Sequence, residues 1–250
     1  MKIKGNKFKV IDGGVFVGMD TKTTLSTDIL TILKKMDANH IDRALVASLA
    51  AVNSCEEEGN GDVLKYSKSS PKRIIPMAVV SPFAFIPGTG AIKKLAKQGF
   101  KIVAAFPLYQ SWPADIHVFR KMAQEIAREK MILQVAVSNW QELANARSLA
   151  EIVETPVLIR WVRGGGYLYT TEEIALAQDF KNLYFDVGNL TTTGGIRQLV
   201  EHVGAHRLYF SSNMPLTYER SIYYNIWTED LSSEDRAMIS GGTLEKVLGL

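Results

Sequence analysis

The chain has 250 residues, which is about the length of one (β/α)8 barrel, although two smaller domains would also fit. Its 29 lysines and arginines exceed its 26 aspartates and glutamates by a net charge of +3, and 46% of its residues are hydrophobic. These values argue against a disordered or low-complexity chain. The basic residues form no run with interleaved aromatic residues, so we expect no nucleic-acid partner.

Cysteine content and hydropathy exclude further classes. The single cysteine, Cys55, excludes a disulfide framework and a cysteine-rich zinc site. No apolar stretch approaches the roughly 18 residues of a membrane span. Residues 1–10 lack the apolar segment of a secretory signal. We therefore expect a cytoplasmic protein without a membrane partner.

Short apolar runs alternate with amphipathic segments along the whole chain. Most of the runs are continuous rather than alternating, which is typical of strands buried on both faces of a parallel sheet. The eight predicted strands cover residues 8–16, 44–48, 74–80, 101–106, 131–137, 156–162, 183–187 and 207–211.

The segments between the predicted strands have helical periodicity. One apolar face consists of Ile29, Leu30, Leu33 and Met36. Thr170 and Glu173 have the spacing of a capping box. The pattern is weakest over 54–69, and an extra helical stretch covers 232–250. Eight strand–helix units favour one closed (β/α)8 TIM barrel over 1–250, an α/β single domain, against an open doubly wound sheet.

The active site of such a barrel lies at the carboxyl ends of its strands. In these regions the chain resembles the amidohydrolase-related (amidohydrolase 2-like) family of TIM-barrel metal-dependent hydrolases and decarboxylases. Ile11-Asp12 and Gly18 match the frame of the family motif Ile-Asp-x-His-x-His-x-Gly. Residues 207–215 resemble its Arg-hydrophobic-Leu-Phe-Gly-Ser-Asp-x-Pro, and residues 36–46, 99–109 and 231–250 match further segments in order. The resemblance implies a TIM barrel and a divalent metal such as zinc.

The chain departs from the family at the metal ligands that the resemblance locates. The histidine positions fall on Gly14, Phe16, Phe106, Trp161 and on or beside Ala136, and the aspartate position falls on Asn213. Glycine, phenylalanine and alanine side chains have no lone pair, and a neutral amide is a poor base. We therefore expect no metal cofactor. An alternative metal set of Asp12, Asp186 and His117 stays open, against the interpretation that both acids bond to barrel neighbours and His117 is solvated.

The remaining polar residues define a candidate site without a metal. Counted from the ligand positions that the resemblance implies, alternation along the strands directs Asp12, Gln134, Trp161, Arg163 and Asn213 to the pocket, and Arg160 to the helix layer or strand edge. The catalytic candidates are Asp12, Asp186 and Asn213, and the ligand-binding candidates are Arg163, Trp161, Tyr109 and Gln134. Arg163 either binds a small anion or pairs with Asp186 or Asp12. The loop 188–195 either cradles an anion or is a flexible loop.

The favoured hypothesis is a divergent hydrolase or decarboxylase relative for a small polar or carboxylate substrate, with the metal site lost and catalysis in doubt. The alternatives are a working enzyme with a relocated site around Asp12, Arg163 and Asp186, and a non-catalytic anion-binding or scaffold protein. We expect a small-molecule ligand, and the aromatic residues 218–227 leave a homo-oligomer open. Phe16, Phe106 and Trp161 distinguish the hypotheses, because no substrate fits if they fill the barrel mouth.

Overall fold

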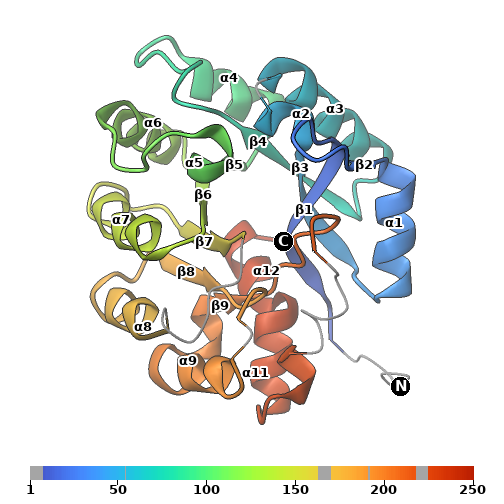
Figure 1. Ribbon diagram of the computed structural model, residues 1–250, viewed down its shortest axis with the longest axis vertical. Helices are drawn as coiled ribbons and strands as arrows, with labels where there is room; N and C mark the ends of the chain where they lie inside the picture. The colour runs from blue at the N-terminus through green and yellow to red at the C-terminus, as the bar shows by residue number, and fades with distance from the viewer. Residues whose placement is uncertain (1–7, 54, 163–169, 191, 218–224) are drawn as a thin grey trace.

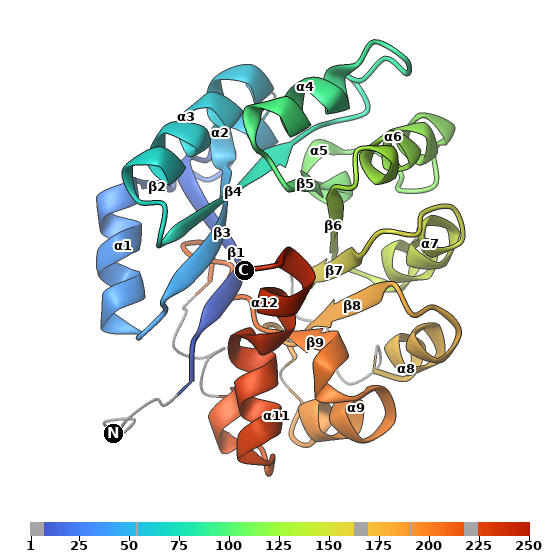
Figure 2. The ribbon, with the colours of Figure 1, turned by 180° about the vertical axis from the view of Figure 1, so that it is seen from behind.

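The computed structural model describes residues 8–53, 55–162, 170–190, 192–217 and 225–250. Figures 1 and 2 show the strands gathered at the centre with helices around them. Among the described residues, the helices are all too short or too polar to cross a membrane.

One curled sheet forms the centre of the molecule, in the order β2-β1-β3-β4-β5-β6-β7-β8-β9. All neighbouring strands are parallel except β2, which pairs antiparallel with β1. The strands are β1 Ile11–Met19, β2 Ser26–Thr27, β3 Arg43–Ser48, β4 Ile74–Val79, β5 Ile102–Ala105, β6 Ile132–Val137, β7 Val157–Trp161, β8 Leu183–Asp186 and β9 Leu208–Tyr209.

The sheet closes where β1 meets the residues after β9. The Gly13 amide donates to the Phe210 carbonyl at 2.8 Å, and the Phe16 amide donates to the Met214 carbonyl at 2.7 Å. The predicted barrel is therefore confirmed, with eight parallel strands at the predicted places and β2 as an addition.

The helices follow the strands and cover the outside of the barrel (Figure 1). The segment 54–69, where the helical pattern of the sequence is weakest, contains the 14-residue helix α3. The helical elements are α1 Ile29–Ala38, α2 Leu49–Val52, α3 Glu56–Ser69, α4 Ala91–Gln98, α5 Pro107–Gln110, α6 His117–Arg128, α7 Trp140–Ala150, α8 Thr170–Asp179, α9 Gly195–Val203, η1 Ala205–Arg207, α11 Ser233–Ala237, the π-helical η2 Met238–Gly242 and α12 Thr243–Leu248.

Two hydrophobic clusters divide the core into an outer and an inner layer. Alternate residues of each strand belong to different clusters, as the pleat of a strand requires. In β5, Val103 and Ala105 pack in the cluster that contains the helix residues, while Ile102 and Ala104 lie in the inner one. The two clusters therefore tell which side chains of each strand point into the barrel.

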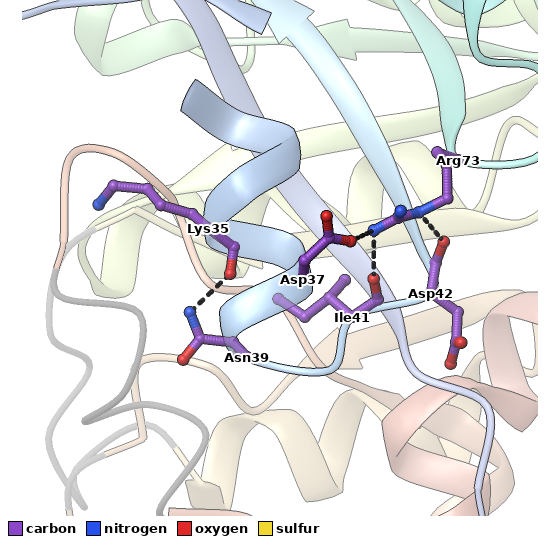
Figure 3. Close-up of polar contacts among 6 residues, drawn as sticks. All are labelled: Lys35, Asp37, Asn39, Ile41, Asp42 and Arg73. Carbon is purple, nitrogen blue, oxygen red and sulfur yellow. Dashed lines mark hydrogen bonds and ion pairs between the residues drawn. The ribbon is translucent and has the colours of Figure 1, made fainter. Parts of the chain in front are cut away.

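The amino-terminal end of the barrel is fixed by Arg73, which lies between α3 and β4 (Figure 3). Its guanidinium donates to the carbonyls of Asp42 and Ile41 at 2.8 and 3.1 Å, and to the Asp37 carboxylate at 2.7 Å. The Asn39 amide donates to the Lys35 carbonyl at 2.8 Å and closes the last turn of α1. These contacts stabilise the end of the barrel opposite to the one where a site is expected.

Candidate functional site

A fully buried arginine, Arg160, lies inside the barrel. Its neighbours in β7, Val157 and Ile159, pack in the outer cluster, while Leu158 packs in the inner one. Alternation therefore turns Arg160 inward, and its side chain is 0% exposed. The predicted orientations of Arg160 and Trp161 are wrong, because the inward-facing residue is one position earlier than expected.

Three side chains hold the Arg160 guanidinium. Nε donates to Asn213 Oδ1 at 2.8 Å, and one terminal nitrogen donates to Gln134 Oε1 at 3.4 Å. The guanidinium carbon lies 4.5 Å from the centre of the Phe16 ring, which gives a cation–π contact. The other terminal nitrogen, Nη2, is buried without a hydrogen-bond partner among the described residues. A buried cation with free N–H groups favours an anionic ligand or water beside it.

Asn213 and Gln134, both predicted to face a pocket, lie inside the barrel, where both contact Arg160. Asn213 has the left-handed φ of 54°, and its amide donates to the Trp161 carbonyl at 2.7 Å. Gln134 Nε2 donates to the Gly13 carbonyl at 2.8 Å. Each amide thus uses its nitrogen on the backbone and leaves its oxygen to accept from Arg160.

Gly14 makes the room that the guanidinium occupies. The register of β1 against β3 shifts between Asp12 and Val15, which places Gly14 in an irregular part of the strand. A Cβ atom at Gly14 would lie 2.2 Å from Arg160 Cζ and 2.3 Å from Nε. Any other residue here would therefore displace Arg160.

Asp12 and Asp186 hold the backbone around the same centre, as one of the two sequence interpretations expected. Asp12 Oδ1 accepts from the Gly14 and Ser212 amides at 3.0 and 2.9 Å, while Oδ2 is buried without a hydrogen-bond partner in the described structure. Asp186 accepts from the Gly188 amide at 2.6 Å and from the Ser211 hydroxyl at 2.5 Å.

Both carboxyl groups titrate near neutral pH. Burial raises the pKa of Asp12 to about 6, against the hydrogen bonds from Ser212 and Gly14 and the charge of Arg160. Burial raises the pKa of Asp186 to about 7, against the Ser211 and Gly188 hydrogen bonds and the same charge. Burial also lowers the pKa of Arg160, and the charge of Asp186 opposes this most strongly among the acids.

Trp161 points away from the barrel, toward helix α8. Its indole Nε1 donates to Glu173 Oε1 at 2.7 Å, and Glu173 is 1% exposed. Burial raises the pKa of Glu173 to about 8, against the hydrogen bond from Trp161. The expectation that Trp161 lines the pocket is therefore wrong. Glu173 was missed, because its spacing from Thr170 matched a capping box and gave no sign of burial.

Aromatic side chains fill the β1–β5 side of the interior. Phe16 and Phe106 are each 1% exposed, and their ring centres lie 5.5 Å apart. The Tyr109 ring meets the Phe106 ring edge-on at 6.3 Å. Lys22, in the loop after β1, donates to the Tyr109 carbonyl. Phe16 and Phe106 thus fill part of the interior, as expected for a barrel without room for a substrate, whereas Trp161 does not, so the three residues divide between the hypotheses.

The other sequence candidates lie apart from this cluster or outside the described residues. Arg163 belongs to the segment 163–169 that the structure does not describe. His117 is exposed at the first residue of α6, in agreement with the solvated interpretation. The amide of Gly194, the N-cap of α9, donates to Glu229 Oε1 at 2.7 Å. A carboxylate of the chain itself therefore lies where the loop 188–195 was considered for an anion.

The donor set at the barrel centre does not fit a divalent metal. The described residues include no group of three histidine, cysteine, aspartate or glutamate side chains able to hold one. Asp12 and Asp186 already accept two hydrogen bonds each, and a cationic guanidinium stands beside them.

The fold of the whole chain is similar to the folds of several solved structures. No protein-family model and no curated protein matches the chain. Among solved structures, 5-carboxyvanillate decarboxylase from Sphingomonas paucimobilis has a TM-score of 0.74 at 11% identity, over 97% of this chain and 99% of its own. An amidohydrolase II gives 0.72 at 14%, over 97% and 100%. An uncharacterised TIM-barrel protein from Bordetella bronchiseptica gives 0.71 at 12%, over 96% and 98%. The chain therefore has the TIM-barrel fold of these decarboxylase and amidohydrolase structures.

Proposed function

We propose that this chain is a divergent amidohydrolase-related protein that binds a small carboxylate ligand at the carboxyl end of its barrel and lacks the metal-dependent hydrolase or decarboxylase activity. The observation that carries the proposal is the buried Arg160 guanidinium, whose Nη2 has no partner among the described residues. A carboxylate oxygen is the acceptor that would satisfy it best, since hydrogen bonds between ions are about twice as strong as neutral ones.

The order of the sequence motifs and the fold support the family part of the proposal. The decarboxylase with the same fold is named for a substrate that carries a carboxyl group. A ligand of that class would bring a negative charge to the cationic centre of this barrel.

The acids support binding rather than catalysis. Asp12 and Asp186 are 0% and 1% exposed and are fixed by backbone amides and Ser211. A general base must reach the proton that it abstracts. Buried carboxyl groups that hold the backbone in this way are poorly placed for that role.

Isothermal titration of the chelator-treated protein tests the proposal. Benzoate and acetate should bind, while benzamide and acetamide, which match them in size but lack the charge, should not. Arg160→Met should lose the binding. Arg73→Met, which removes a guanidinium at the opposite end of the barrel, should keep it (Figure 3).

Two results would contradict the proposal. One is equal binding of the acids and the amides by the wild-type protein. The other is metal-dependent hydrolysis or decarboxylation that the chelator abolishes. Circular dichroism of Arg160→Met separates lost binding from lost folding, and the comparison of acids with amides needs no variant.

A further inference from the structure

Three residues around Arg160 share one property: they stand where the resemblance places metal ligands. Gly14 and Phe16 occupy the two histidine positions of the first-strand motif, and Asn213 occupies the aspartate position. Each of the three is adjusted to the same guanidinium. Gly14 leaves the space, the Phe16 ring faces the cation at 4.5 Å, and Asn213 Oδ1 accepts from Nε at 2.8 Å.

These replacements depend on one another physically. With Gly14 changed to histidine, even the Cβ atom would lie 2.2 Å from Arg160 Cζ. Without Arg160, the buried oxygens of Asn213 and Gln134 would lose their donor. Loss of the metal ligands alone would not explain why two amide oxygens and an aromatic ring all contact the Arg160 guanidinium.

The charge of the centre follows the same pattern. Burial raises the pKa of Asp12 and of Asp186, and the nearby positive charge of Arg160 opposes this rise in both. A divalent cation added here would meet a guanidinium that remains protonated at any ordinary pH. Repulsion between the two cations in a buried site would oppose metal binding even where oxygen ligands remain.

We infer that the Arg160 guanidinium has taken the place of the divalent metal and is the resident cation of this barrel. The inference rests on the proposed function, and it adds that the same side chain both excludes the metal and presents the positive charge to the ligand. A guanidinium supplies directed N–H donors in a fixed plane, whereas a metal takes lone pairs into open coordination positions.

The first test uses the wild-type protein. Elemental analysis after incubation with zinc or manganese and gel filtration should find far less than one metal per chain. Addition of a chelator should leave the melting temperature unchanged. Stoichiometric metal, or a melting temperature that falls with chelator, would overturn the inference.

The second test restores two ligand positions beside Arg160, and three in a chain without it. Phe16→His with Asn213→Asp keeps Gly14 and Arg160, and it should still bind no zinc by titration. Adding Arg160→Ala and Gly14→His to the same chain should produce zinc binding and a zinc-dependent rise in melting temperature. Equal zinc binding by both chains would overturn the inference, because Arg160 would then not exclude the metal. If the fourfold variant does not fold, the inference is tested by the metal content of the wild-type protein and by zinc titration of the Arg160-containing variant.

The outcomes also separate the inference from the proposed function. Wild-type protein that binds neither metal nor benzoate would refute carboxylate binding and leave the exchange of cations standing. Benzoate binding that requires zinc would refute the exchange and leave carboxylate binding standing.

Discussion

Gly14→Ala gives the most direct measure of how tightly Arg160 is held. The added methyl group would lie 2.2, 2.3 and 2.5 Å from Cζ, Nε and Nη2 of Arg160, so the guanidinium must move. Gly14 does not have a positive φ, and the change therefore introduces no backbone strain of its own. The whole effect is expected to come from the side-chain contacts that Arg160 loses.

The expected loss follows from those contacts. The hydrogen bond from Nε to Asn213 involves a charged donor and is worth about 1.5–3 kcal/mol. The desolvated cation–π contact with Phe16 is worth about 2 kcal/mol. We expect Gly14→Ala to lower the free energy of unfolding by about 3–5 kcal/mol, as for a buried ion that loses its partners. In a chain of this size the melting temperature would fall by about 6–20 °C.

Urea denaturation of Gly14→Ala beside Gly61→Ala measures this effect. Gly61 lies in α3, and a Cβ atom there would meet nothing within 4 Å. That control should gain about 0.4–1 kcal/mol through the lower entropy of its unfolded chain. The opposite signs distinguish the Arg160 contact from a general effect of glycine replacement. A loss below about 1 kcal/mol for Gly14→Ala would refute the account of Arg160 as tightly held.

Three further predictions concern buried polar groups around the barrel. Because the folded-state pKa of Glu173 is about 8, above its ordinary value of 4.5, the unfolded chain ionises first. The free energy of unfolding should therefore fall as pH rises through this interval, by up to about 1.4 kcal/mol per pH unit. Urea denaturation at pH 5, 7 and 9 should show that Glu173→Gln removes this contribution to the pH dependence. Tyr209→Phe removes the donor to the Ile159 carbonyl, 2.9 Å away, and should lose about 1–3 kcal/mol in urea denaturation. Asn60→Leu leaves the buried amide and carbonyl of Val79 unpaired and should lower the melting temperature more than Tyr209→Phe. A flat pH profile for wild type, or unchanged stability of either variant, would contradict these assignments.

The strands could be predicted because they are buried on both faces. Continuous apolar runs gave every parallel strand within a few residues of its observed bounds, from β3 at Arg43–Ser48 to β8 at Leu183–Asp186. Burial on both faces also means that the sequence pattern does not show which side chains point into the barrel. In Ile159-Arg160-Trp161-Val162 neither alternate set is polar throughout, so the pattern does not show which side chains point inward.

The candidate site was predicted in part for the same reason. Gln134, Asn213 and the two acids are polar residues within or just after apolar strand runs, and the structure brings them around one centre. Arg160 was assigned to the wrong side through a shift of one residue. The available signal was the pair of glycines after Asp12, since consecutive glycines in a strand often mark the close approach of another group.

The inferred exchange of a metal for a guanidinium would limit what the barrel can do. A bound metal acts as a Lewis acid and lowers the pKa of its water to about 7, which supplies a nucleophile at neutral pH. A guanidinium has no vacant coordination position that accepts a lone pair of water and only donates N–H hydrogen bonds, so it stabilises an anion without generating hydroxide. Asp186 accepts a hydrogen bond on each oxygen and could replace the nucleophile only by releasing one of them, while Asp12 is fixed through Oδ1 and has only its buried Oδ2 without a partner among the described residues. The groups that would perform catalysis thus also hold the backbone of the barrel, and this double use supports the proposed binding function.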